Sequence, residues 1–361
     1  MSEARRLLHD TVTRLFAATV DKEQIARTER GEWPASLWNQ VEAAGLTQPH
    51  QLGDELEDGW LDAFVILRAS GRYCVPLPLA ETILATWLLA RAGMPVPSGP
   101  LTVCATPLDA GQVHDGKVTT TLARLPWGRH CSSAVAVVAR QGLAEVILID
   151  LADATVLEGH NLALEPRDDL SAIRSDVEAA RPTTLPANIV ELYGALVRSA
   201  QMAGALDALL EMSVQYAGER LQFGRPIGQF QAIQQELARL AGAAAEAGMA
   251  AEVACRAAAE ARQDFHATIG ASGDPSFEIA CAKVIAGDAA ELAPRIAHQV
   301  HGAIGFTYEH ALHFATRRLW AWRADYGTAS QWAERLGAHT FAIGPDALWP
   351  AVTGRISGRM H

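Results

Sequence analysis

One apolar stripe limits the possible folds of this chain more than any other feature. Apolar residues recur every three or four positions at Ile189, Leu192, Leu196, Ala203, Leu206, Leu210 and Val214, which predicts a long helix with one buried face. We expect a second helix from Phe230 through the alanine-rich stretch 241–261. A third begins at the cap and first-turn pair Asp274-Pro275 and reaches about Val300. Long helices with short connections favour an antiparallel four-helix bundle.

The earlier part of the chain has two other patterns. Residues 1–97 are typical of helices, and the last of these ends at the stop signals Gly93 and Pro95. Residues 98–185 change to a period of two, with strand-like runs at 101–105, 118–122, 134–138 and 146–151. Turns are expected at Asp115-Gly116 and Gln141-Gly142. The chain is therefore predicted to be an α+β protein with an N-terminal helical domain (1–97), a small antiparallel β domain (98–185) and a C-terminal helical bundle (186–361).

Composition excludes several function classes. The formal net charge of -11 argues against a nucleic-acid partner. Neither an apolar run of 18 residues nor a signal-peptide core is found, so we expect no membrane insertion and a cytoplasmic location. The five cysteines are scattered without a C-x-x-C pair, and the histidines lack a completing carboxylate pattern, so no metal site is predicted.

Two short motifs carry the functional signal. Residues 216–231 read Y-A-G-E-R-L-Q-F-G-R-P-I-G-Q-F-Q, and residues 299–306 read Q-V-H-G-A-I-G-F. In this order and spacing they resemble the acyl-CoA dehydrogenase family, whose signatures read roughly Y-x-x-x-R-x-Q-F-G-x-P-I-x-x-F-Q and Q-x-x-G-G-x-G-[FY]. L-P-L-A-E-T at 77–82 also stands as in that family. The resemblance implies the family's fold of helical domain, β domain and bundle, and FAD as cofactor.

The resemblance also implies roles for particular residues. Arg220 would bind the FAD pyrophosphate across a subunit interface, since a guanidinium is a planar bidentate donor. Gln222 would hydrogen-bond nearby, Phe223 would pack beside the adenine half and Gln231 would line the same region. The remaining implied FAD contacts are Gln299, Gly302, Gly305 and Thr328.

The alternative for the first motif is a surface arginine followed by a plain helix end. For the second motif, Gly302 and Gly305 would stop a helix in any protein. Ala303 stands where the family usually has a second glycine, which makes close approach of the backbone to adenosine less easy at that point.

The catalytic base of the family is missing from its usual place. Abstraction of the α-proton of an acyl-CoA needs a carboxylate beside the substrate, and in many members a glutamate precedes a Gly-Thr pair. Here Gly327-Thr328 is present, but Tyr326 occupies the glutamate position. The flavin-cradling T-E-x-x-x-G-S-D and K-x-W-I-[ST] sequences are also not found between 98 and 185.

A chain that keeps the two motifs but lacks the base and the flavin cradle resembles the non-catalytic type of subunit in heteromeric bacterial acyl-CoA dehydrogenases of steroid and cholesterol degradation. These enzymes assemble as heterotetramers with two copies of each chain. The partner would then supply the base and the flavin cradle. Two alternatives stay open. One is a self-sufficient homo-oligomer with a displaced base at Glu191, Glu309 or Asp325. The other is a non-enzymatic assembly partner. The sequence leaves the acyl group open between steroid, branched and aromatic thioesters.

Overall fold

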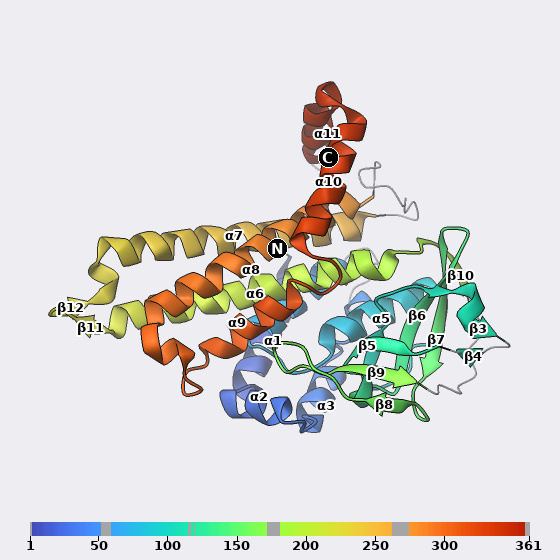
Figure 1. Cartoon of the computed structure of the whole chain (residues 1–361), viewed down its shortest axis with the longest axis horizontal. Coiled ribbons are helices and arrows are strands. Elements are labelled where there is room, and N and C mark those ends of the chain that lie inside the picture. The colour runs from blue at the N-terminus through green and yellow to red at the C-terminus, as the bar shows by residue number, and fades with distance from the viewer. Residues whose placement is uncertain are drawn as a thin grey trace.

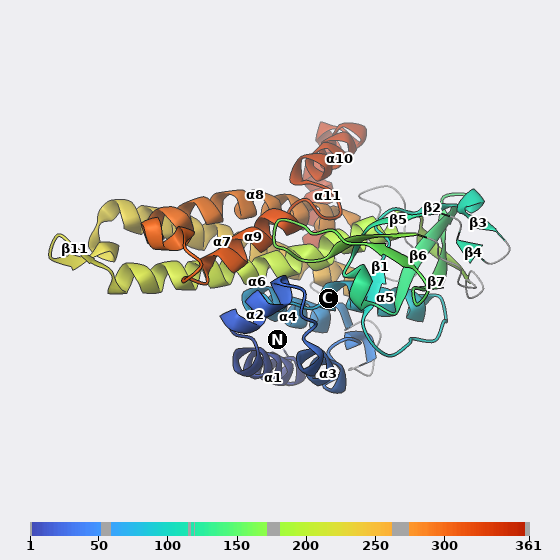
Figure 2. The ribbon, with the colours of Figure 1, turned by 60° about the horizontal axis from the view of Figure 1, so that its bottom comes forward.

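The structure is a computed structural model that describes residues 2–51, 59–114, 117–118, 120–171, 181–261 and 274–357. Long helices run along the longest axis of the molecule, and the strands lie at one end of them (Figure 1). The first helices pack beneath the bundle when the view is turned (Figure 2). Within the described residues, none of the helices combines the length and apolar content needed to cross a membrane.

The N-terminal region is helical. It contains α1 (Glu3–Thr19), α2 (Lys22–Glu29), α3 (Ala35–Ala43), the short 3-10 helix η1 (Pro49–Gln51), α4 (Gly59–Arg72) and α5 (Leu79–Arg91). The Ser2 side chain caps α1 by accepting a hydrogen bond from the backbone N–H of Arg5, and Asp21 caps α2 in the same way. Helix α5 is buried from Leu79 to Leu89 because it contacts both the sheet and the bundle.

The main sheet is built around a hairpin of β6 (Ser133–Arg140) and β7 (Leu143–Asp150). Its turn residues Gln141 and Gly142 have φ values of 50° and 82°, the positive values that a two-residue hairpin turn requires. The predicted turn at this place is therefore confirmed. Strand β10 (Arg181–Pro186) pairs antiparallel with β7, whereas β1 (Leu101–Val103) and β2 (Leu108–Asp109) pair parallel with β6.

Smaller sheets complete the β region. Strand β9 (Arg167–Ser171) pairs antiparallel with β5 (Leu122–Pro126) and with β8 (Thr155–Leu157), and β3 (Val113–His114) pairs with β4 (Lys117–Val118). The predicted single strand at 118–122 is wrong, because its first residue belongs to β4 and its last residue starts β5 in another sheet. The turn expected at Asp115-Gly116 lies outside the described residues.

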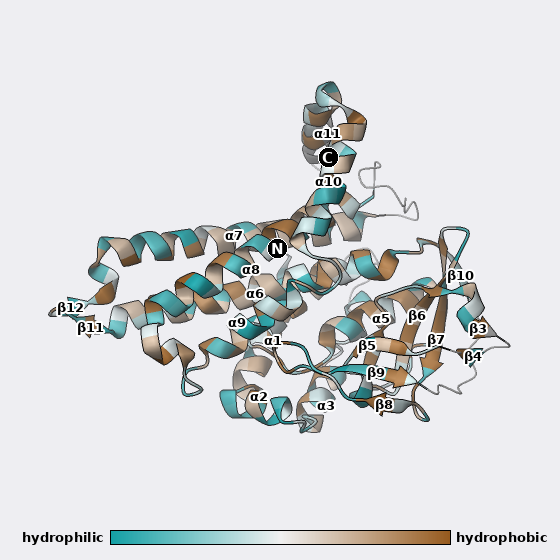
Figure 3. Ribbon diagram, in the orientation of Figure 1, coloured by the Kyte–Doolittle hydropathy of each residue, from teal (hydrophilic) through white to brown (hydrophobic). Residues whose placement is uncertain are grey.

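The apolar run of β6 is explained by burial on both faces. Val135 and Val137 join the core shared with α5, whereas Ala134, Ala136 and Val138 join a second core beneath the sheet. The hydropathy colouring shows this apolar character in β6 and β7 (Figure 3).

The C-terminal helices form the predicted bundle. They are α6 (Ile189–Glu219), α7 (Gln231–Glu260), α8 (Ser276–His301) and α9 (Leu312–Trp322). Two-residue strands β11 (Leu221–Gln222) and β12 (Arg225–Pro226) and the 3-10 turn η4 (Ile227–Gln229) connect α6 to α7, and η5 (Gly302–Phe306) follows α8. Helix α10 (Ala329–Ile343) packs against α8, and with α11 (Pro345–Ser357) it forms an arm that projects from the bundle (Figure 1).

Glycines bring α4 and α6 into backbone contact. A Cβ added at Gly71 would lie 1.9 Å from the carbonyl oxygen of Gln201, and one added at Gly204 would lie 1.8 Å from that of Arg68. Any larger residue at either position would separate the helices. This crossing therefore fixes the N-terminal helices on the bundle.

Candidate functional site

The first motif forms a hairpin at the end of the bundle. Helix α6 ends at Glu219, and Phe223 and Gly224, with φ values of 51° and 80°, make the turn between β11 and β12. The backbone of Arg220 is fixed, since its N–H donates to the Tyr216 carbonyl at 2.9 Å and its carbonyl accepts from Ile227 at 2.8 Å. The hairpin of β11 and β12 therefore forms a protruding tip at this end of the bundle (Figure 1).

The predicted binding side chains of this tip are exposed. Arg220, Gln222 and Gln231 are all exposed, and the Phe223 side chain is 92% exposed. Within the described residues, the guanidinium of Arg220 and the side-chain amides of Gln222 and Gln231 have no hydrogen-bond partner. Their donors are therefore available to a group from outside the chain.

The second motif lies at the same end of the bundle. The Tyr216 ring stacks on His301, with centroids 4.6 Å apart and an interplanar angle of 23°. Gln299 and Gly302 are exposed, and Gly302 ends α8 with a φ of 61°. The stack thus places Gln299, Gly302 and Gly305 at the same end of the bundle as the hairpin with Arg220, Gln222 and Phe223 and the start of α7 at Gln231.

Gly305 is buried, and side chains of the same chain occupy the space that a side chain at this position would fill. A Cβ there would lie 3.0 Å from His301 Cβ and 3.2 Å from Leu312 Cδ2. Gly305 therefore serves the tight turn into α9, while the side chain of Ala303 is exposed.

Thr328 does not join this group. It is the N-cap of α10, where its hydroxyl accepts a hydrogen bond from the Gln331 backbone at 3.3 Å. Helix α9 separates it from the η5 end, and eleven residues span about 16 Å. Four histidines, namely His298, His301, His310 and His313, gather near η5, but no three metal-binding side chains in the described residues are placed to hold an ion.

Tyr326 is enclosed by its own chain. Its residue is 8% exposed and has a φ of 55°, and its carbonyl accepts a hydrogen bond from Trp332 Nε1 at 2.9 Å. A Cβ added at Gly194 would lie 2.3 Å from the tyrosine ring, so the ring packs directly on this glycine. Burial raises the pKa of Tyr326 above its usual value of 10, which leaves a neutral phenol at physiological pH.

Asp325, the carboxylate nearest to Tyr326 in the sequence, accepts hydrogen bonds from two guanidiniums. Its Oδ2 accepts from Arg167 Nη2 at 2.8 Å and from Arg198 Nε at 3.1 Å. Burial alone would raise the pKa of Asp325, but the two arginines outweigh this and hold the pKa below its usual value. A carboxylate in this state is a weak base.

The same cluster continues into the interior. Arg198 also donates to Glu81 on α5 and to Gln201, and both members of the Arg198–Glu81 pair are almost fully buried. Lys283 donates to the carbonyls of Trp322 and Asp325 at 2.9 and 2.8 Å, and burial lowers its pKa to about 7. Buried ion pairs and hydrogen bonds therefore occupy the charged groups beside Asp325, and the Arg198 guanidinium lies 5.8 Å from the centre of the Tyr326 ring.

Of the other candidate bases, Glu191 lies close to Tyr326 and Glu309 does not. Glu191 Oε1 accepts from Arg335 Nη2 at 2.7 Å and lies 3.5 Å from the Cβ position of Gly327. Glu309 is exposed in the segment before α9, at the opposite end of that helix from Tyr326.

Known proteins resemble this chain in its C-terminal helices and along most of its length. Residues 192–329 match the family model described as the acyl-CoA dehydrogenase C-terminal domain. The chain is 28% identical over 336 residues to acyl-CoA dehydrogenase IpdE2 of Mycobacterium tuberculosis, covering 88% of this chain and 91% of that protein. Residues 192–329 therefore carry the C-terminal domain of the acyl-CoA dehydrogenase family, and the relative that is similar along most of the chain is an acyl-CoA dehydrogenase. This is a family of oxidoreductases with FAD as cofactor.

Solved structures share the whole fold. A chain of the ChsE4-ChsE5 complex from Mycobacterium tuberculosis superposes with a TM-score of 0.80 at 24% identity, covering 96% of this chain and 99% of that one. A variant of the Tcur3481-Tcur3483 steroid ACAD (acyl-CoA dehydrogenase) gives 0.80 at 21% identity, covering 93% and 97%.

The donor set at the tip fits FAD in its chemistry. A free guanidinium and several free amides suit a pyrophosphate and the polar edges of an adenosine. No comparable donor set surrounds Tyr326 in the described residues, because its charged neighbours are already paired with one another.

Proposed function

We propose that this chain is a subunit of a heteromeric FAD-dependent acyl-CoA dehydrogenase, and that the partner chain supplies the catalytic base. The observation that carries the proposal is the enclosed Tyr326 at the family's glutamate position. Its phenol is neutral and packed on Gly194, and the adjacent Asp325 is held by Arg167 and Arg198. Abstraction of an α-proton needs a carboxylate in reach of the substrate, so the base belongs to another chain.

The exposed tip supports a contribution to FAD binding across the interface. Arg220 would grip the pyrophosphate, with Gln222, Gln231 and Gln299 at its polar edges and Phe223 beside the adenine. Gly302 and Gly305 would shape the backbone around it, and Thr328 would contact the cofactor at a separate place. When bound, FAD accepts the hydride that leaves the acyl-CoA.

A second acyl-CoA dehydrogenase-like chain is the proposed partner, in a heterotetramer with two copies of each. Two of the similar structures are named for pairs of chains, and one is named a steroid ACAD. We therefore propose a steroid-derived acyl-CoA as substrate. The buried thiols of Cys74, Cys104, Cys131 and Cys255 suit a reducing cytoplasm.

One observation favours a second candidate, a self-sufficient homo-oligomer. The Glu191 carboxylate lies beside Gly327, next to the position that the family's glutamate occupies. Its ion pair with Arg335 would have to open before it could act as a base.

Flavin content tests the proposal. The chain is purified alone and after co-expression with a candidate acyl-CoA dehydrogenase-like partner, and the flavin absorbance per chain is measured. We expect an almost colourless chain alone and one FAD per pair of different chains. Stoichiometric FAD in the chain alone would support the homo-oligomer instead. Absence of FAD from both preparations would leave only an assembly role.

A further inference from the structure

A pocket on another face of the molecule takes no part in the site described above. It has a volume of about 830 Å³ and lies between α1, α4, α6 and α7. None of its fifteen lining residues belongs to the exposed tip or to the buried charged cluster beside Tyr326, which consists of Glu81, Arg167, Arg198, Lys283 and Asp325. Pockets of roughly 300–1,000 Å³ are typical of small-molecule sites.

The floor of this pocket is apolar and only partly exposed. Leu61, Phe64 and Val65 come from α4, and Leu210 and Val214 come from α6. Val214 is 50% exposed, although it continues the apolar stripe of α6. An apolar ligand body would cover this surface and gain the free energy of removing it from water.

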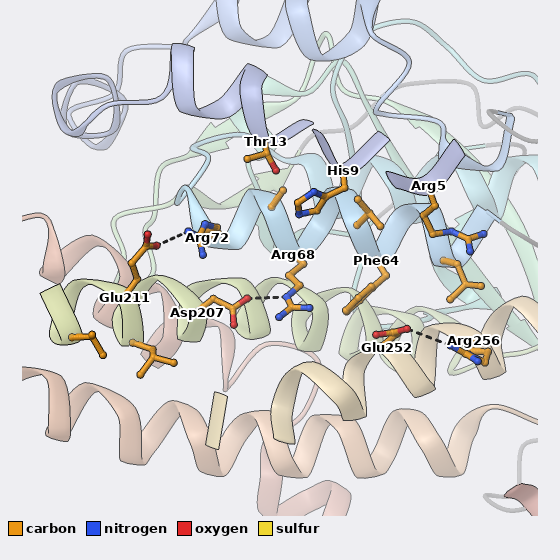
Figure 4. A pocket seen from close by; sticks show the side chains of 15 residues that line it. Arg5, His9, Thr13, Phe64, Arg68, Arg72, Asp207, Glu211, Glu252 and Arg256 are labelled. Atoms are coloured by element: carbon orange, nitrogen blue, oxygen red, sulfur yellow. Dashed lines mark hydrogen bonds and ion pairs between the residues drawn. The ribbon is translucent and has the colours of Figure 1, made fainter. Parts of the chain in front are cut away.

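Four arginines also line this pocket, namely Arg5, Arg68, Arg72 and Arg256. Figure 4 shows Arg68 and Arg72 on one helix, with Arg256 and Arg5 further along the pocket. Arg72 donates to Glu211, and Arg256 donates to Glu252 at 3.3 Å. Each of these ion pairs uses a single guanidinium nitrogen, so donors remain.

Arg68 is the best placed of these donors. Its Nε donates to Asp207 at 2.8 Å, which fixes the plane of the guanidinium. Its Nη1 and Nη2 have no acceptor in the part of the chain that the structure describes. Nη2 would lie 3.5 Å from a Cβ at Gly248, an ordinary van der Waals distance, so α7 packs beside the guanidinium without crowding it. Two parallel N–H donors of this kind match one carboxylate.

The acidic residues limit the charge of the ligand. Asp207, Glu211 and Glu252 line the same pocket and would repel a polyanion such as a nucleotide or the phosphates of coenzyme A. We propose that this pocket binds an amphipathic monocarboxylate, with its apolar body on the floor and its carboxylate on Nη1 and Nη2 of Arg68. The proposal does not depend on the proposed function of the chain.

A fluorescent fatty acid tests this site. 11-(Dansylamino)undecanoate is titrated into the full chain, alone or in its complex, and its methyl ester is titrated in parallel. We expect the acid to bind and Arg68→Gln to weaken it about 10- to 100-fold, since a charge-assisted pair is lost. Val214→Glu should also weaken it, because the new carboxylate would lie on the floor.

Arg239→Gln is the matched control. Arg239 forms an exposed ion pair with Glu236 on α7 outside the pocket, so this variant should bind the probe as the unmodified chain does. Circular dichroism and thermal melting establish that each variant is folded. Equal binding of the acid and its methyl ester would overturn the proposal. So would unchanged affinity in folded Arg68→Gln, or no binding of the acid at all.

Discussion

The contact between Gly194 and Tyr326 gives a prediction that can be measured as a coupling energy. A Cβ at position 194 would lie 2.3 Å from two ring atoms of Tyr326, whereas ordinary van der Waals contact begins at 3.4 Å. The ring or helix α6 must therefore move by about 1 Å in Gly194→Ala. Overpacking of this kind costs about 1–3 kcal/mol of unfolding free energy.

Tyr326→Ala removes the ring and should destabilise the chain by about 3–5 kcal/mol, as loss of a buried aromatic side chain does. In the double variant the new methyl group enters the space that the ring has left. We therefore expect the two changes together to cost about 1–3 kcal/mol less than their sum. Urea unfolding of the four proteins, followed by circular dichroism, measures the difference.

Gly204→Ala is the matched control, because its Cβ would meet the backbone oxygen of Arg68 at 1.8 Å and not a side chain. It should destabilise the chain without coupling to Tyr326→Ala. Additive costs for Gly194→Ala and Tyr326→Ala would refute the reasoning, since the tyrosine ring would then not fill the position where the family places its base.

Three further perturbations follow from the geometry. Arg220→Lys should weaken FAD retention by the assembled complex, measured by flavin release on dilution, because an ammonium cannot replace a bidentate fork; equal retention would contradict the assigned role. Glu81→Ala should cost about 3–5 kcal/mol by leaving Arg198 short of a buried partner, and a cost near zero in urea unfolding would contradict it. Lys283 has a pKa of about 7 in the folded chain, below its usual 10.5, so between these pH values the unfolded chain binds one more proton than the folded chain. The free energy of unfolding should therefore rise by about 1 kcal/mol per pH unit in this range. Lys283→Met should lack that rise.

The local parts of the fold were predictable from the sequence. The apolar stripe from Ile189 to Val214 predicted α6, because helical periodicity depends only on residues close together in the sequence. The Gln141-Gly142 pair predicted its hairpin turn because a two-residue turn also depends only on neighbouring residues. The two motifs lie at the same end of the bundle, which the family resemblance implied and periodicity did not.

The contacts between distant residues were not predictable. Glu81 and Arg198 are 117 residues apart, and Arg167 and Asp325 are 158 apart, so no local pattern pairs them. The one available signal was the presence of charged residues within apolar helical faces, as with Arg198 in α6. Parallel pairing of β1 with β6 also joins distant segments, and an alternating pattern predicts a strand without its direction.

The most direct test of the central claim asks whether this chain supplies the base. The assembled complex is prepared with Tyr326→Phe and Glu191→Gln together in this chain, and flavin reduction by the acyl-CoA is followed in a single turnover. We predict an unchanged rate with full FAD content, because the base lies in the partner. A loss of about 10²- to 10⁴-fold, with folding and FAD content intact, would contradict the account.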